Sequence, residues 1–185
     1  MEIDGQNIRH LSLDNYRSQN TLIDGKPVFF GATIEENLRK VQPGISEREF
    51  QEILEISGLQ KVLENLPEGI STEINQFGMP LSQGDRVTLA LARGLMSGPR
   101  ILLIDEALAN LDKSGQISFF ENFAKISELK TVIMATHDLR STTKFEQIIV
   151  LDKGAAVGQG THDELLKTCR LYQELWAMEQ KLTGT

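Results

Sequence analysis

The amino-acid sequence predicts an α/β protein in which a mostly parallel sheet is flanked by helices. Three short and almost wholly apolar runs support this prediction, at residues 101–104, 131–135 and 147–151. Such runs are typical of strands that are covered on both faces, as in parallel sheets. Segments with helical spacing lie between them, which is the alternation expected of an α/β fold. A chain of 185 residues is long enough for one domain with its own core.

The composition narrows the possible function classes. Charged residues make up 24% of the chain and hydrophobic residues 40%, as in ordinary soluble proteins. The net charge of −7 argues against a general nucleic-acid binder. The apolar runs are too short to span a bilayer. The single cysteine, Cys169, excludes an internal disulfide and is typical of a cytosolic protein.

Several helix starts are marked by capping boxes, in which a Ser or Thr and a Glu three residues later satisfy each other's backbone N–H groups. The pairs are Thr33 with Glu36, Ser46 with Glu49, and Thr161 with Glu164. A brief strand is expected at residues 21–23, before the first pair. A further helix is expected from Ser114 to about residue 129. Its buried side should carry Ile117, Phe120, Phe123 and Ala124.

Two acids, Asp105 and Glu106, directly follow the apolar run 101–104. The carboxyl ends of parallel strands border the ligand crevice of open α/β sheets, so both side chains are expected there. The first carboxylate suits a Mg²⁺ shell of oxygens and waters, and the second suits polarising an attacking water. His137 follows the neighbouring run 131–135 and is expected at the same crevice. The alternatives are a solvated acid pair that opens a loop, and an ordinary loop histidine.

The segment LSQGD, residues 81–85, places a hydroxyl residue and a glycine at a helix start. A helix N-terminus offers free N–H groups and the positive end of a dipole, both of which suit a phosphate. The alternative is that Ser82 is an ordinary N-cap. The helix that follows should stop at Gly98-Pro99.

Together these segments resemble the nucleotide-binding domains of ATP-binding cassette (ABC) transporters. LSQGD resembles the LSGGQ signature, ILLIDE at 101–106 the Walker B strand, ALANLD at 107–112 the D-loop, and ATHDL at 135–139 the H-loop. Residues 148–166 are similar to the segment IxVLxxGxIxExGTHxELL of the family. The segment 69–78 resembles a loop typical of exporters, and importers usually lack it.

The resemblance implies an incomplete P-loop ABC ATPase core plus an α-helical signature subdomain at about residues 33–97. Residues 1–32 and 98–185 would form parts of the core. The resemblance implies ATP and Mg²⁺ as cofactors. The implied partners are a second nucleotide-binding domain and the transmembrane domains of an exporter. The implied location of the chain is the cytoplasmic face of a membrane. Phe29 and Phe30 would lie near the groove that receives a helix of the membrane domain, or would be core aromatics. The implied roles are catalysis for Glu106 and His137, nucleotide contact for Ser82, Gln83, Gly84, Asp85 and Asp112, and a water-mediated Mg²⁺ contact for Asp105.

The sequence also departs from the family pattern. Gln83 and Asp85 replace a glycine and the final glutamine of the signature, and Asp85 adds a negative charge where a γ-phosphate would dock. Gly25 stands where the family has the Q-loop glutamine, and Gln76 replaces an acid of the exporter loop. The phosphate-binding pattern GxxxxGK[ST] does not occur in the 185 residues. The chain alone is therefore expected to be inactive as an ATPase, and its sheet to keep exposed apolar faces and unpaired edges.

Two other readings remain open at this point. The chain could be a degenerate cassette that acts as a binding or regulatory partner, as Gly25, Gln76 and Asp85 suggest, although Glu106 and His137 argue against it. It could also be the C-terminal lobe of a chromosome-maintenance or repair ATPase of the ABC type. No sustained heptad repeat precedes the signature, which disfavours this last reading.

Overall fold

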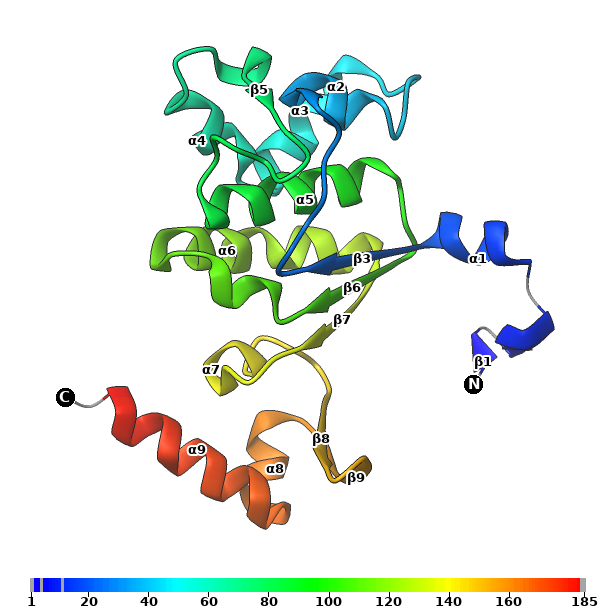
Figure 1. Ribbon diagram of the computed structural model, residues 1–185. Coiled ribbons are helices and arrows are strands. Elements are labelled where there is room, and N and C mark those ends of the chain that lie inside the picture. Colours follow the sequence, from blue (N-terminus) through cyan, green and yellow to red (C-terminus); the bar gives the residue numbers. More distant parts are fainter. Residues whose placement is uncertain (1, 4, 11, 184–185) are drawn as a thin grey trace. The chain divides into compact units, whose positions relative to one another are not determined.

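The computed structural model describes residues 2–3, 5–10 and 12–183. The chain divides into two units, Met1–Ala135 and Thr136–Thr185, and each is described by itself. The predicted α/β architecture is confirmed, since helices flank a sheet of parallel strands in the first unit (Figure 1). Within the described residues, no helix is both long and apolar enough to cross a membrane.

The sheet of the first unit has the strand order β3-β6-β7, and both pairings are parallel. The strands are β3 (Asn20–Asp24), β6 (Ile101–Asp105) and β7 (Thr131–Ala135). These bounds confirm the strands predicted at 21–23, 101–104 and 131–135. The register aligns Asp24 with Asp105, so the last residues of β3 and β6 are neighbours at the carboxyl edge.

One face of this sheet is covered, and the other is partly open. Leu102 and Ile104 point into the core and are buried, whereas Leu103 on the opposite face is only half-buried. Its partners in register, Leu22 and Ile133, are 60% and 55% exposed. The prediction that these runs are covered on both faces is therefore wrong for this face. The expected exposed apolar face is found, and among the described residues β3 and β7 each pair only with β6.

Helix α5 (Gln83–Met96) is the centre of the first unit. Most of its residues are buried, because it packs on β3 on one side and on α2, α3 and α4 on the other (Figure 1). The surrounding elements are β4 (Ala32–Thr33), α2 (Ile34–Arg39), α3 (Glu47–Ile56), α4 (Leu59–Glu64), η2 (Gly69–Ser71) and β5 (Glu73–Ile74). The capping box of Thr33 and Glu36 starts α2 as predicted, and the Ser46 side chain caps α3 by accepting from the Glu49 backbone N–H.

The helix after the D-loop is α6 (Lys113–Leu129), and its buried side differs from the prediction. Phe119, Phe123 and Ile126 are buried, whereas Ile117 is exposed. Apolar residues between 117 and 126 are spread around half of the helix, so spacing alone could not identify the buried side. The elements η3 (Ala107–Asn110), β1 (Glu2–Ile3), β2 (Gln6–Asn7), η1 (Ile8–His10) and α1 (Leu13–Gln19) complete this unit.

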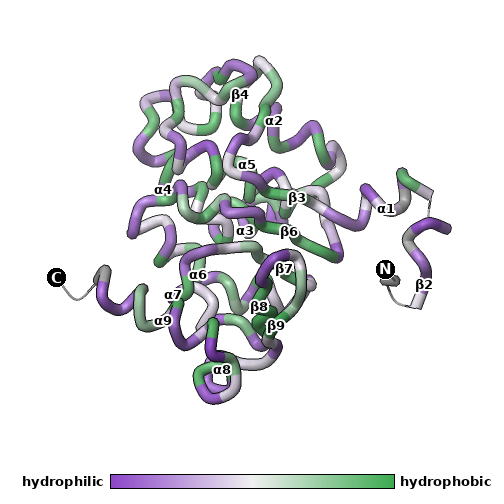
Figure 2. The backbone as a smooth tube through the Cα atoms, turned by 60° about the horizontal axis from the view of Figure 1, so that its bottom comes forward, coloured by the Kyte–Doolittle hydropathy of each residue, from purple (hydrophilic) through white to green (hydrophobic). Residues whose placement is uncertain are grey.

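The second unit is a β-hairpin packed against helices. The third apolar run forms β8, whose hydrophobic residues are green in Figure 2, and it pairs antiparallel with β9. The core of the second unit is formed by Ile148, Val150, Leu165, Cys169 and Tyr172. Ile149 and Leu151 are exposed, so the prediction of a strand buried on both faces is wrong here too. The elements are α7 (Leu139–Thr142), β8 (Ile148–Asp152), β9 (Ala155–Gly160), α8 (His162–Thr168) and α9 (Arg170–Thr183).

Candidate functional site

Ser82 is the N-cap of α5, and Asp85 completes a capping box with it. The Ser82 Oγ accepts a hydrogen bond from the Asp85 backbone N–H at 3.1 Å and donates one to Asp85 Oδ2 at 2.6 Å. The Ser82 backbone N–H donates to the same carboxylate oxygen at 3.3 Å. The helix start thus already holds a negative charge, which is favourable at the positive end of the helix dipole. A phosphate at this N-terminus would have to compete with the Asp85 carboxylate.

The signature packs against the D-loop of the same chain through Asn110. The Gln83 Nε2 donates a 2.6 Å hydrogen bond to Asn110 Oδ1. A Cβ at Gly84 would lie 3.3 Å from the Asn110 backbone oxygen, so the two segments approach closely here. A Cβ at Gly25 would lie only 2.7 Å from Asn110 Nδ2. The sequence reasoning missed Asn110, and its only available signal was an amide among the small and apolar residues of ALANLD.

Asp112 ends the D-loop and is the N-cap of α6. Its Oδ1 accepts a hydrogen bond from the Gly115 backbone N–H at 2.7 Å, and the Ser114 Oγ donates to the carboxylate at 3.2 Å. The helix therefore begins at Lys113 rather than at Ser114. These bonds give the exposed carboxylate a structural role, and its contact with a nucleotide stays a prediction.

The two predicted acids lie at the carboxyl edge of the sheet. Asp105 is the last residue of β6, beside Asp24 of β3, and both side chains are exposed. Glu106 adopts the left-handed backbone conformation with φ of 50°, which costs a non-glycine residue about 1 kcal/mol. Its backbone N–H donates to the Ala135 oxygen at 3.0 Å, which fixes the turn against the end of β7. Glu106 is exposed as well, so the edge presents carboxylates to solvent.

The carboxylates at this edge of the sheet suit a Mg²⁺ site that is shared with phosphate oxygens and waters. No cluster of three or more His, Cys, Asp or Glu side chains that could hold a metal occurs among the described residues. A dedicated protein cage is therefore not present in this part of the chain. One or two carboxylates at a phosphate site are the usual protein ligands of Mg²⁺, which keeps its waters and takes phosphate oxygens. The carboxylate of Asp105 suits a contact with Mg²⁺ through water, and this role stays a prediction.

His137 belongs to the second unit and is exposed in the loop that precedes α7. The loop is held by the Thr136 hydroxyl, which accepts a hydrogen bond from the Asp138 backbone N–H at 3.0 Å. The pairing of His137 with Glu106 and a γ-phosphate stays a prediction.

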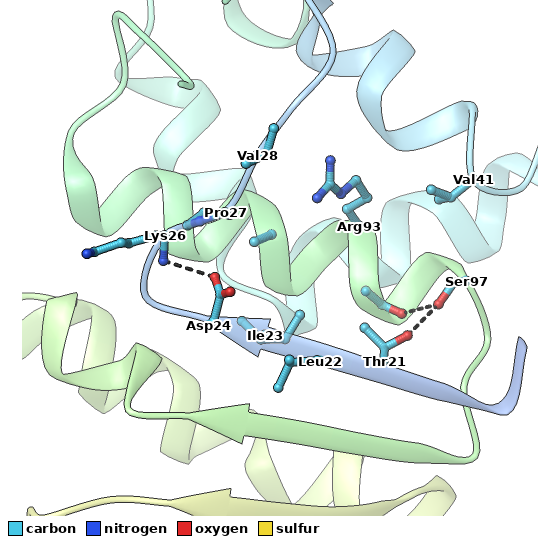
Figure 3. Close-up of a pocket in the computed structure, with 12 residues that line it drawn as sticks. Thr21, Leu22, Ile23, Asp24, Lys26, Pro27, Val28, Val41, Arg93 and Ser97 are labelled. Carbon is cyan, nitrogen blue, oxygen red and sulfur yellow. Dashed lines mark hydrogen bonds between the residues drawn. The ribbon is translucent and has the colours of Figure 1, made fainter. Parts of the chain in front are cut away.

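A cavity of about 430 Å³ lies beside β3, between the segment 24–28 and α5 (Figure 3). A Cβ at Gly94 would lie 2.7 Å from Ile23 Cδ1, so glycine allows α5 and β3 to approach at its floor. Arg93 reaches into the cavity from α5, and its guanidinium lies 5.0 Å from the centre of the Phe29 ring. Burial lowers the pKa of Arg93 below its usual value. Sequence reasoning missed this side chain, which a helical pattern cannot distinguish from a surface arginine.

The aromatic residues expected near a docking groove have separate environments. Phe29 is buried, as in the alternative of a core aromatic, whereas Phe30 is 45% exposed. The Phe29 backbone N–H donates to the Gln76 oxygen at 3.0 Å and so links this segment to the exporter-like loop. In that loop, the Asn75 side chain accepts hydrogen bonds from the backbone N–H groups of Phe77 and Met79 at 2.9 and 3.1 Å. Phe77 is thereby held at an exposed tip.

Comparison with known proteins gives the class of this fold and site. The family model described as ABC transporter matches residues 1–109. The ATP-binding cassette sub-family B member 6 of Mesocricetus auratus is 30% identical over 181 residues, covering 98% of this chain and 22% of the relative. A multidrug resistance ABC transporter ATP-binding and permease protein of Lactococcus lactis subsp. lactis is 31% identical, covering 98% of this chain and 31% of the relative.

A solved structure agrees with these matches. The structure of a bacterial Atm1-family ABC exporter with ATP bound superposes with a TM-score of 0.88 and 31% sequence identity, over 96% of this chain and 31% of that one. The chain belongs to the ABC transporter family, and it corresponds to an ATP-binding domain whose solved neighbour is named as an ABC exporter. It spans between a fifth and a third of the length of these relatives.

Proposed function

We propose that this chain is the ATP-binding and hydrolysing component of an ABC exporter, in which it couples ATP binding and hydrolysis to transmembrane transport. The observation that carries the proposal is the arrangement of Asp105 and Glu106 at the carboxyl edge of a parallel sheet, followed by a D-loop that packs on the signature. Such edges are where α/β folds bind ligands. The family match and the ATP-bound structural neighbour support it.

The proposed roles follow from the chemistry of each side chain. Asp105 would hold the hydrated Mg²⁺, which supplies positive charge to the phosphates. Glu106 would accept a proton from the attacking water, and His137 would donate to the γ-phosphate. Ser82, Gln83, Gly84 and Asp85, together with Asp112, would face the nucleotide that is bound by a second nucleotide-binding domain. The partner domain and the cytoplasmic face of the membrane as location are parts of the same proposal.

A specific observation also favours a second candidate, a degenerate cassette that binds or regulates without turnover. The Asp85 carboxylate occupies the start of α5, where it repels a phosphate. Asn110 lies where the side chain of a glutamine at position 25 would begin. The third reading, a chromosome-maintenance or repair ATPase, is disfavoured because the Lactococcus lactis relative is named as a transporter and the structural neighbour as an exporter.

The experiment that tests the proposal is a chimera. The 185 residues replace the corresponding segment of the Lactococcus lactis relative, which then provides the rest of the transporter, and steady-state ATPase activity is measured in membranes. Turnover that disappears with Glu106→Gln supports the catalytic function. No turnover in the chimera, but turnover after Asp85→Gln, would favour the degenerate cassette. If the chimera and its Asp85→Gln variant were both inactive, the proposal that this chain contributes to ATP hydrolysis would be overturned.

A further inference from the structure

The side-chain amide of Asn110 has one atom that is engaged and one that is free. Its Oδ1 accepts the 2.6 Å hydrogen bond from Gln83 Nε2. Among residues 2–3, 5–10 and 12–183, Asn110 Nδ2 has no hydrogen-bond acceptor. This nitrogen is in contact with solvent, because every buried side-chain nitrogen or oxygen in that part of the chain has a partner. Asn110 therefore offers two amide N–H groups to a ligand.

The free nitrogen lies at the carboxyl edge of the sheet. The element η3 ends at Asn110 and follows Glu106 directly at the end of β6. On the neighbouring strand, Nδ2 lies beside Gly25, the residue that follows the end of β3. A Cβ at position 25 would lie 2.7 Å from this nitrogen, so the glycine leaves room for the amide there.

Contacts with two helices hold Asn110 in this position. A Cβ at Gly84 would lie 3.3 Å from the Asn110 backbone oxygen, so a second glycine lets η3 approach the start of α5. From α6, the Gln116 Nε2 donates to the backbone oxygens of Leu108 and Leu111 at 3.1 and 3.3 Å. A donor that is fixed before its ligand arrives loses little conformational entropy on binding, which favours affinity.

The charge of this edge determines which ligand a free N–H donor can serve. Asp24, Asp105 and Glu106 present exposed carboxylates there. Carboxylates repel the oxygens of a phosphate, so a terminal phosphate at this edge needs a cation and hydrogen-bond donors. A bound Mg²⁺ would supply the cation. The Asn110 amide is the side-chain donor that the structure places beside Gly25.

We propose that Asn110 binds the terminal phosphate of Mg-ATP through a hydrogen bond donated by Nδ2, and that Gly25 makes room for this amide. The inference rests on the proposed function, because it takes ATP from there and adds a residue to the same site. Glycine at position 25 is then part of the site rather than a sign of its decay. The degenerate cassette loses position 25 as support and keeps the Asp85 carboxylate.

The test compares Mg-ATP with Mg-ADP, because the two nucleotides differ in the terminal phosphate. Both are titrated into the solubilised chimera with the Lactococcus lactis relative, in the Glu106→Gln background so that hydrolysis does not consume the ATP. Displacement of a fluorescent nucleotide gives each affinity. Asn110→Ala is expected to weaken binding of Mg-ATP about tenfold, as for the loss of a hydrogen bond to a charged group, and to leave Mg-ADP unchanged. Asn65→Ala, which removes an exposed amide at the end of α4, is the matched control and should change neither affinity.

A second variant separates contact with the ligand from a structural role. Gly25→Gln/Asn110→Ala returns an amide to the same edge, from the end of β3 instead of η3, and should recover the preference for Mg-ATP. The hydrogen bond from Gln83 stays absent in this variant, so recovery would not come from repair of the contact with α5. A preference that is not recovered would assign Asn110 a structural role and overturn the proposal.

The outcomes also separate this inference from the proposed function. Unchanged affinities in Asn110→Ala, or equal weakening of Mg-ATP and Mg-ADP, would overturn the role of Asn110. Nucleotide binding and ATPase activity of the chimera would in that case still support the exporter function. A chimera that binds neither nucleotide would overturn the proposed function and this inference together. Urea unfolding of each variant of the 185-residue chain checks the fold separately.

Discussion

Gln83 at the start of α5 donates a 2.6 Å hydrogen bond to Asn110, 27 residues further along the chain. The bond joins the signature to the loop that follows the Walker B acids. The same Asn110 side chain occupies the space next to Gly25. Two positions at which the chain departs from the family pattern, 25 and 83, therefore meet at one asparagine.

The structure predicts that glutamine at position 25 displaces the Asn110 side chain and destabilises the chain modestly. In Gly25→Gln, the new Cβ would lie 2.7 Å from Asn110 Nδ2, so the Asn110 side chain must turn away and lose its bond to Gln83. The free energy of unfolding should fall by about 1 kcal/mol, the usual net contribution of one hydrogen bond. In the Asn110→Ala background the same change should cost almost nothing.

Urea unfolding of the four variants in this cycle measures the coupling. The matched control is Gly31→Gln, because a Cβ at Gly31 meets no atom within 4 Å and that change should be nearly neutral. Equal costs of Gly25→Gln in the two backgrounds would show that Asn110 does not restrict position 25.

Much of the first unit was predictable from sequence, because its signals are local. Apolar runs identified β6 and β7, the short segment 21–23 indicated β3, and the acids at the end of β6 follow from the strand boundary. Contacts between distant segments were not predictable, and Asn110 is an example, since nothing in its neighbours indicates that it meets Gln83 and Gly25. The buried side of α6 also depended on packing, because Phe119 and Phe123 are buried whereas Ile117 is exposed. The exposure of Ile133 similarly depends on which elements lie next to β7.

The second unit should be destabilised when the hydroxyl of Tyr172 is removed. The Thr142 hydroxyl donates to the Leu139 oxygen, so the Tyr172 hydroxyl must donate to Thr142 Oγ1, at 3.1 Å, and accept from His162 Nδ1, at 2.8 Å. Tyr172 is almost fully buried. In Tyr172→Phe, the His162 N–H loses its acceptor, and the expected loss is about 1–3 kcal/mol.

The single tryptophan, Trp176, reports this unfolding by fluorescence, because its ring lies 4.5 Å from the ring of His162. The matched control is Tyr16→Phe, since Tyr16 is the other tyrosine and lies in the first unit. It should change the transition by less than about 0.5 kcal/mol. An unchanged midpoint for Tyr172→Phe would show that these two hydrogen bonds do not stabilise the second unit.

Acid should weaken the fold partly through the capping boxes. Hydrogen bonds from the backbone and side chain of Thr161 lower the pKa of Glu164 below 4.5, and those of Thr33 do the same for Glu36. A carboxylate whose pKa is lower in the folded state contributes stability above its unfolded pKa and loses it as pH falls through the folded pKa. The loss should therefore occur below about pH 4.5, the unperturbed value.

The double variant Glu36→Gln/Glu164→Gln checks this, because glutamine keeps a capping side chain without the titration. The difference in free energy of unfolding between pH 6 and pH 3 should be smaller for this variant than for the wild type. Glu68→Gln, which removes a carboxylate outside the capping boxes, is the control and should leave the difference unchanged. Equal pH dependence of the double variant and the wild type would rule out the contribution of these two boxes.

The 185 residues by themselves should bind Mg-ATP weakly or not at all. In the proposed roles, Asp105 and Glu106 would serve the metal and the water. The strongest phosphate ligands of this class of ATPase, however, are the backbone N–H groups and the lysine of GxxxxGK[ST], a pattern that the sequence does not contain. Calorimetric titration of Mg-ATP into the purified chain should therefore give no saturable heat, and ATP hydrolysis should equal that of Glu106→Gln. Clear binding, or hydrolysis that is lost in Glu106→Gln, would contradict this prediction. It would mean that another surface or a neighbouring copy completes the site, and sedimentation of the ATP-bound sample would then distinguish a monomer from a dimer.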